Sequence, residues 1–194
     1  MPEADLAYLD SKQITDVGFK SVGRNVLISN KASFYGADKI SIGDNVRIDD
    51  FCIFSATNGL FNIGNYIHIA AYTSIIGAGS VDLLDFCNIS SRVSIYSSSD
   101  DYSGISMTNP MVPAIYKNVH SASVLIGKHV IIGCGSVILP GVQIDAGSAI
   151  GALSLVNKNC DASKIYAGVP IRCIGQRNSE LLHLEKKFLS SISG

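Results

Sequence analysis

The 194-residue chain has no tryptophan, only four histidines and a charged fraction of just 16%, whereas 47% of its residues are hydrophobic. Its net charge is −1 and its basic residues are scattered, so nothing predicts a nucleic-acid-binding surface. No uninterrupted apolar run approaches the roughly 20 residues that a membrane-spanning helix needs. The composition therefore favours one soluble domain with a sizeable core.

A secretory signal and a disulfide framework are also missing. The N-terminal stretch MPEADLAYLD is acidic and lacks a basic segment followed by an apolar one, so we expect a cytoplasmic protein without membrane insertion. The five cysteines are odd in number and contain no Cys-x-x-Cys pair, which indicates neither disulfides nor a zinc knuckle. We expect Cys52, Cys87, Cys134, Cys160 and Cys173 to be small buried apolar residues.

What the chain does have is 18 glycines and a repeat. From Ile126 to Val156 an aliphatic residue recurs every six positions, and the same spacing organises the earlier chain in groups of three. A period of six fits short strands joined by tight turns, with three strands to one triangular coil. All of these anchor positions are apolar: Val22, Ile28, Phe34, Ile42, Ile48, Phe54, Ile63, Ile69, Ile75, Leu83, Ile89, Ile95, Ile126, Ile132, Ile138, Ile144, Ile150 and Val156.

The step between coils shows where the repeat is interrupted. Early coils begin about twenty residues apart because extra residues enter at one corner, whereas the step from Ile95 to Ile126 is 31 residues. One long loop, residues 97–123, is therefore expected to leave the solenoid at that corner. We divide the chain into an N-terminal cap (1–21), the solenoid (22–175) and a C-terminal helix (176–194).

The open ends of a solenoid must be covered. Residues 11–17 predict a short helix over the first coil, with Ser11 as a candidate N-cap. Near the other end Asn178 can cap a helix that places Leu181, Leu184 and Phe188 on one face, which would cover the last coil or a neighbouring subunit.

With this repeat over residues 22–175, the sequence resembles the hexapeptide-repeat acyltransferases, whose fold is an all-β, left-handed parallel β-helix. Its C-terminal part, IYAGVPIRCI, is similar to the V-x-G-N-P-A-R-like motif of the galactoside, maltose and xenobiotic O-acetyltransferases. The resemblance implies a homotrimer that binds acetyl-CoA between subunits. Carried over by position, it assigns cofactor binding to Cys134, Ala152, Asn157, Lys158 and Arg172.

The last two of these residues have a physical reason to be cationic. Acetyl-CoA carries several phosphate charges, and Lys158 and Arg172 could form charge-assisted hydrogen bonds with them. The alternative for Lys158 or Arg172 taken alone is that it is a solvated surface charge that binds no ligand. Val169 and Ile171 replace the asparagine and alanine of the motif, so the wall of the cofactor groove differs here.

Acetyl transfer to a sugar hydroxyl or amine needs a group that removes a proton. Where the galactoside and maltose enzymes have a catalytic histidine, alignment from Ile95 places Asp100, in the stretch SSSDDYSG. We therefore consider three histidines as the base: first His68, with a ring oriented by Asp100 or Asp101, then His120, then His129. A structural histidine and a turn-capping aspartate are the alternatives for His68 and Asp100.

A narrower resemblance bears on the substrate. His68-Ile69-Ala70, the DDYSG stretch and TNPMVP are similar to elements of sugar acetyltransferases linked to surface polysaccharides, such as those of lipopolysaccharide O-antigen. We expect acetyl transfer from acetyl-CoA to a nucleotide-linked sugar or polysaccharide precursor. A xenobiotic O-acetyltransferase and a non-catalytic scaffold are the alternatives.

A metal-dependent activity is also considered. Hexapeptide helices also serve as γ-class carbonic anhydrases, but no two histidines of this chain lie within eight residues of each other, so no metal site is expected.

Overall fold

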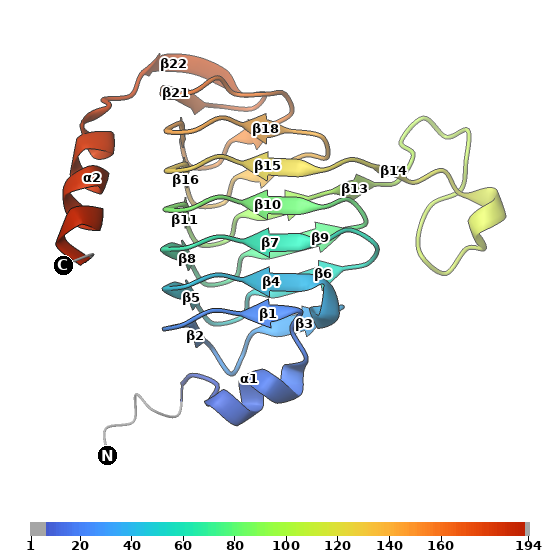
Figure 1. The fold of residues 1–194 in the computed structure, drawn as a ribbon. Coiled ribbons are helices and arrows are strands. Elements are labelled where there is room, and N and C mark those ends of the chain that lie inside the picture. Colours follow the sequence, from blue (N-terminus) through green and yellow to red (C-terminus); the bar gives the residue numbers. More distant parts are fainter. Residues whose placement is uncertain (1–6, 193–194) are drawn as a thin grey trace.

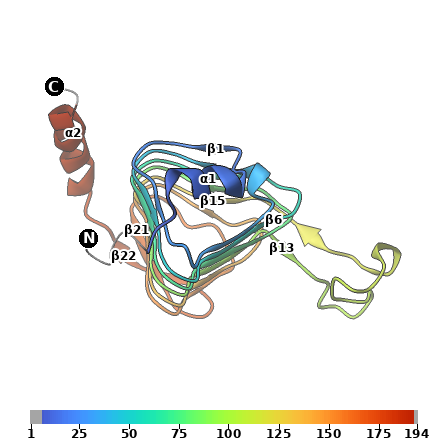
Figure 2. The ribbon, with the colours of Figure 1, turned by 90° about the horizontal axis from the view of Figure 1, so that it is seen from below.

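The computed structural model describes residues 7–192, so the first six residues of the predicted N-terminal cap and the last two of the C-terminal segment lie outside it. Its main body is a left-handed parallel β-helix with the cross-section of a triangular prism (Figures 1 and 2). No helix within residues 7–192 is long and apolar enough to cross a membrane.

Each side of the prism is one sheet, and its strands pair in parallel except β22, which pairs antiparallel with β21. Face 1 holds β1 (Ser21–Val22), β4 (Ile40–Ile42), β7 (Phe61–Ile63), β10 (Val81–Leu83), β15 (Val124–Ile126) and β18 (Gln143–Ile144). Face 2 holds β2 (Leu27–Ile28), β5 (Val46–Ile48), β8 (Ile67–Ile69), β11 (Asn88–Ile89), β16 (Ile131–Ile132), β19 (Ala149–Ile150), β21 (Lys164–Ala167) and β22 (Arg172–Gln176). Face 3 holds β3 (Ser33–Tyr35), β6 (Ile53–Ala56), β9 (Ser74–Gly77), β12 (Ser94–Tyr96), β17 (Val137–Ile138) and β20 (Leu155–Val156).

The six-residue period produces the core. The predicted anchors from Ile42 onward are all buried and stack in register, as in the row Ile48, Ile69, Ile89, Ile132 and Ile150. The two least buried anchors, Val22 and Phe34, belong to the first coil, which has a neighbouring coil on one side only. Three cysteines, Cys52, Cys87 and Cys160, are buried as expected, but the prediction was wrong for Cys134 and Cys173, which are exposed.

The lower end of the prism is covered by α1 (Ser11–Val17) and the residues beside it, and Leu9, Ile14 and Phe19 pack against the core there. The N-cap is Asp10 rather than the predicted Ser11. The Asp10 carboxylate accepts a hydrogen bond from Gln13 N at 2.8 Å, while the Gln13 side chain accepts one from Asp10 N at 2.9 Å. This reciprocal pair satisfies two backbone donors that would otherwise lack partners.

The upper end closes differently. Strand β22 folds back antiparallel on β21, and the guanidinium of Arg177 then donates to the carbonyl oxygens of His129, Gly147 and Ser148. These bonds bring the chain to α2 (Glu180–Ile192), where Asn178 Oδ1 accepts from Glu180 N at 2.8 Å, so Asn178 caps the helix as predicted. Helix α2 lies outside the prism, beside the starts of the face 2 strands (Figure 1).

Three corners separate the faces: the first corner lies between faces 1 and 2, the second between faces 2 and 3, and the third between faces 3 and 1. Turn residues at the first corner have positive φ, which suits Asn25 and Asn45 but costs a bulky side chain about 1–2 kcal/mol. Tyr66, Phe86 and His129 nevertheless occupy this position in successive coils. Their rings stack at 5.0 and 4.9 Å, and this contact offsets the strain.

Candidate functional site

The long loop leaves and re-enters the prism at one point of the third corner. Ser97 is fully buried, and its hydroxyl donates to Gly79 O at 2.7 Å. Its carbonyl oxygen accepts from Ala122 N at 3.0 Å, so the outgoing and returning chains are joined there. Beyond this point β13 (Ser98–Ser99) and β14 (His120–Ser121) form a short antiparallel ribbon that projects from the prism (Figure 1).

The ribbon brings together two residues that are far apart in sequence. His120 lies opposite Ser99, and Asp100 follows Ser99, so these two candidate residues flank the base of the loop. Both are exposed. Farther out the loop carries the 3₁₀ turn η3 (Ala114–Tyr116) and a bridge between Met107 and Lys117.

Two cavities share Asp100 as a wall. The larger, about 410 Å³, lies between the start of the loop and face 3. Its lining residues are Tyr96, Ser98, Ser99, Asp100, Tyr102, Val137, Leu139 and Pro140. The smaller, about 170 Å³, is lined by Asp100, Asp101, Tyr102 and Thr108. We call the pair the loop cavity.

The two adjacent carboxylates of the loop cavity differ in their partners. Asp101 accepts hydrogen bonds from Ser103 N at 2.8 Å and from Ser106 N and Oγ at 3.1 and 2.7 Å. These bonds to the serines lower the pKa of Asp101 to about 2. Within residues 7–192 the Asp100 side chain has no hydrogen-bond or ion-pair partner, so its carboxylate is free to meet a ligand.

Within one subunit His68 lies away from this loop, so the predicted pairing of His68 with Asp100 or Asp101 stays a prediction that needs a second subunit. His68 points outward from β8 on face 2, which lies across the prism from the third corner. Its Nε2 is 2.8 Å from Asp49 Oδ2, and Arg47 Nε donates to Asp49 Oδ1 at 2.7 Å. Asp49 was not among the predicted site residues, although the register Ile48↔Ile69 makes it a neighbour of His68.

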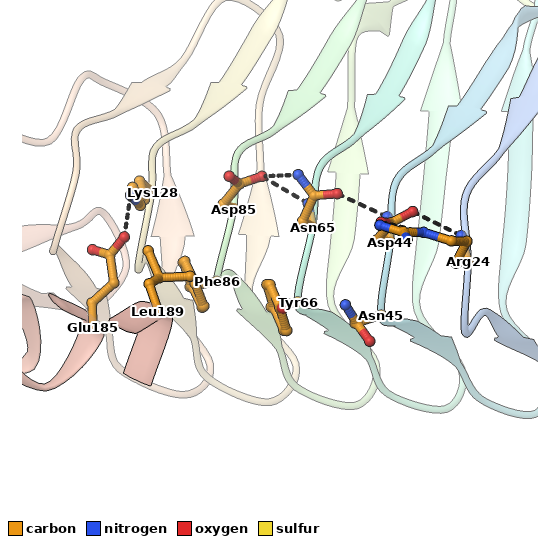
Figure 3. Close-up of a pocket in the computed structure, with 10 residues that line it drawn as sticks. All are labelled: Arg24, Asp44, Asn45, Asn65, Tyr66, Asp85, Phe86, Lys128, Glu185 and Leu189. Atoms are coloured by element: carbon orange, nitrogen blue, oxygen red, sulfur yellow. Dashed lines mark hydrogen bonds and ion pairs between the residues drawn. The ribbon is translucent and has the colours of Figure 1, made fainter. Parts of the chain in front are cut away.

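His129 is bound by the C-terminal helix at the first corner. Next to it lies a cavity of about 320 Å³, whose lining residues are drawn in Figure 3. The His129 Nε2 is 2.8 Å from Glu185 Oε2, and the ammonium of Lys128 bonds the other oxygen of Glu185. The His129 side chain is only 13% exposed. This contact between helix and prism makes His129 a poor candidate for a base acting on a substrate.

The rest of that cavity is an internally paired column. Arg24 bonds Asp44 at 2.7 Å, Asp44 N donates to Asn65 Oδ1, and Asn65 donates to Asp85 (Figure 3). The chain of contacts connects one coil to the next. These polar groups thus stabilise the corner on which α2 docks.

The predicted cofactor residues lie along two corners of the upper coils. Cys134 and Ala152 occupy the second corner in successive coils, where Leu153 N donates to Cys134 O at 2.9 Å. Arg172 follows above them, because it pairs with Ala167 at the end of β21. Asn157 and Lys158 lie at the third corner, one coil beyond the Leu139–Pro140 wall of the loop cavity.

This placement suits a long anionic ligand. All five residues are exposed. Neither Lys158 nor Arg172 forms an ion pair within the described part of the chain, so both cations are available to phosphate groups. The exposed main chain at Cys134 and Ala152 offers polar groups between them. The residues therefore fit the phosphate-bearing donor that the resemblance implies.

Known proteins resemble this chain over most of its length. The family described as bacterial transferase hexapeptide (six repeats) matches residues 123–158. The dTDP-4-amino-4,6-dideoxy-D-glucose acyltransferase of Escherichia coli is 59% identical over 97% of this chain and 98% of its own length. The galactoside O-acetyltransferase of Escherichia coli strain K12 is 30% identical over 74% of this chain and 66% of its own.

Solved structures extend the likeness to bound ligands. AntD, an N-acyltransferase from Bacillus cereus in complex with dTDP and 3-hydroxybutyryl-CoA, is 47% identical, covers 97% of this chain and 99% of its own, and superposes with a TM-score of 0.92. A serine-to-alanine variant of the same enzyme has dTDP-4-amino-4,6-dideoxyglucose and coenzyme A bound, with a TM-score of 0.91, 47% identity and coverage of 95% and 98%.

Proposed function

Because the chain belongs to the hexapeptide-repeat acyltransferases and is an acyl-CoA-dependent sugar acyltransferase, we propose that its acceptor is the free amine of a dTDP-linked 4-amino-4,6-dideoxy sugar. The product is an amide rather than an ester. Membership in an enzyme family sets aside the non-catalytic scaffold, and identity over nearly the whole chain favours a nucleotide sugar over a xenobiotic.

The observation that carries the proposal is the unpartnered carboxylate of Asp100 on the wall of the loop cavity. A carboxylate only accepts hydrogen bonds, and an amine or ammonium offers several donors. Asp100 can hold the acceptor nitrogen and receive its proton as that nitrogen attacks the thioester. The C–N bond forms, the C–S bond breaks, and the proton leaves nitrogen for the carboxylate and then the thiolate of coenzyme A.

The studied variants of the relative point to the same part of the chain. In the Bacillus cereus enzyme, substitutions were made at a serine and at an aspartate ten positions later. Ser90 and Asp100 have the same separation here, and so do Ser91 and Asp101. Ser90 comes before β12 at the second corner, whereas Asp100 follows β12 beyond the third, so an acceptor that touched both would need two subunits.

A homotrimer accounts for both this separation and the surface of the loop. Tyr102, Ile105, Met111 and Ile115 are 94%, 90%, 90% and 83% exposed. Apolar groups gathered on a projecting loop indicate a surface that another chain covers. In the proposed trimer the loop of one subunit reaches face 3 or face 2 of the next, and the reaction takes place in the cytoplasm, where acyl-CoA and nucleotide sugars occur.

His68 remains a second candidate for the proton acceptor. The contact of its Nε2 with Asp49 orients the ring and leaves Nδ1 to accept a proton. Asp49 is anchored in turn by Arg47. A neighbouring subunit could bring this pair to a loop cavity, although one subunit alone cannot.

The acceptor is tested by incubating purified protein with acetyl-CoA and either dTDP-4-amino-4,6-dideoxyglucose or its 4-hydroxy counterpart. The product is read by mass spectrometry, because the exposed Cys134 and Cys173 would react with a thiol reagent. Acetylation of the amine alone supports the proposal. Equal acetylation of the hydroxyl counterpart, or none of the amine, would refute it.

A further inference from the structure

We propose that Asp101 is a positioning residue that fixes the first turn of the loop and thereby aims Asp100 into the loop cavity. This inference rests on the proposed function, because it assigns Asp100 to the acceptor. It gives the second of the two adjacent carboxylates a role distinct from the first.

The hydrogen bonds define the turn. Asp101 closes a ring over the five residues that follow it, with one oxygen on Ser103 N and the other on Ser106 N and Oγ. Gly104, at φ 82°, lies inside this ring and has nothing within 4 Å of the position a Cβ would take. The backbone there needs the left-handed region that glycine enters at no steric cost.

The hydrogen bonds of Asp101 matter because packing against the rest of the chain does not order residues 102–105. Residues 102–105 are all exposed, so burial does not fix their conformation. Fixing one residue costs about 1–2 kcal/mol of conformational entropy. Three hydrogen bonds to one charged group are the means available to offset that cost.

The same turn places the two walls of the cavity. Asp100 precedes Asp101 and Tyr102 follows it, and both line the larger and the smaller parts of the loop cavity. Rotation of the backbone at residue 101 would therefore move the reactive carboxylate and the facing ring together. A displacement of about 1 Å at such a group is enough to lower a rate about a hundredfold.

Asn has nearly the shape of Asp, but an amide NH₂ replaces one of the two oxygens that accept hydrogen bonds. D101N therefore breaks part of the hydrogen-bonded ring from residue 101 to residue 106. We expect kcat for amine acylation to fall about ten- to hundredfold, with the KM for acetyl-CoA unchanged. S106A removes one of the three donors and should lower kcat severalfold. D16N, on α1 far from the loop, is the matched control.

The decisive comparison is the double variant. If Asp101 acts through Asp100, D100N/D101N is no slower than D100N alone. Hydrogen exchange at the Ser103 and Ser106 amides should also be faster in D101N than in wild type, while strand amides keep their rates. A wild-type kcat in D101N, or losses that multiply in the double variant, would overturn the inference.

These outcomes separate the inference from the proposed function. If wild-type protein does not acylate the dTDP-linked amine, the proposed function is wrong. The exchange rates at Ser103 and Ser106 then still decide whether Asp101 orders the turn, and unchanged rates in D101N would refute that role.

Discussion

Glu185 connects the C-terminal helix to the prism, and its replacement by glutamine should undock α2 without unfolding the solenoid. The Glu185 side chain is 10% exposed and its two oxygens bond Lys128 and His129. Phe188 adds an edge-on contact with Tyr66 at 5.3 Å. A helix of 13 residues is marginal in isolation, so α2 depends on these contacts.

The magnitude follows from the two bonds. A hydrogen bond to a charged group contributes about 1.5–3 kcal/mol. Glutamine keeps one acceptor oxygen but loses the charge, so E185Q should lose the equivalent of one such bond, about 2 kcal/mol. Because each 1.4 kcal/mol is a factor of ten, the undocked fraction should rise about thirtyfold.

Hydrogen exchange measures this fraction directly, since α2 amides exchange when the helix undocks. We expect about thirtyfold faster exchange in α2 of E185Q and unchanged rates in β15 and β16. The control is E180Q on the same helix, because the Glu180 side chain has no ion-pair partner within residues 7–192. Unchanged α2 rates in E185Q, or equal acceleration in E180Q, would refute the assignment of docking to Glu185.

Three further results are expected. Bonds from Lys128 and then His129 hold the pKa of Glu185 below its ordinary value, so the stabilisation is complete above the ordinary carboxylic range and is lost as the pH falls through the lowered pKa. Once exchange rates are corrected for the intrinsic pH dependence of amide exchange, the protection of α2 amides in wild type should fall in acid, and unchanged protection in acid would contradict this. I132A removes a fully buried side chain and should lower the free energy of unfolding by about 2–5 kcal/mol, whereas I131A, on the outward side of the same strand, should cost far less; equal losses in thermal unfolding would argue against the inward register. If Lys158 binds a phosphate of the donor as predicted, K158A should raise the KM for acetyl-CoA severalfold with kcat nearly unchanged, and K187A on α2 should leave both constants as in wild type.

The solenoid could be predicted because its repeat is local. Within each coil the anchors are six residues apart, so burial of Ile48, Ile69 and Ile89 follows from a pattern visible within one coil. The loop could be located for the same reason, since it is an interruption of that pattern. The ribbon at its base was not predicted, because the pairing of Ser99 with His120 joins residues on either side of the loop.

Side-chain partners across coils were harder to predict. The hydrophobic face expected for α2 included Leu184, yet that side chain is 56% exposed and the neighbouring Glu185 faces the prism instead. From the sequence alone, a charged residue at position 185 is expected to face solvent. Its partners Lys128 and His129 are far away in the sequence, and only the fold places them next to it. Asp49 was missed as a partner of His68 for a similar reason, because it becomes a neighbour only through the register of the coils.

The two aspartates show a different limit. Adjacent carboxylates are indistinguishable in the sequence, and both were considered as partners of a histidine. The structure separates them because Asp101 turns toward Ser103 and Ser106 while Asp100 faces the loop cavity. Their roles in the reaction are proposals that kinetics must test.

The most direct test of the account is the kcat of D100N for acetyl transfer to dTDP-4-amino-4,6-dideoxyglucose, measured beside H68N, H120N and the control D16N. We predict a loss of at least a hundredfold for D100N, with the KM for acetyl-CoA unchanged and D16N equal to wild type. Near wild-type turnover by D100N, with the loss appearing in H68N or H120N instead, would contradict the assignment of the acceptor amine to Asp100.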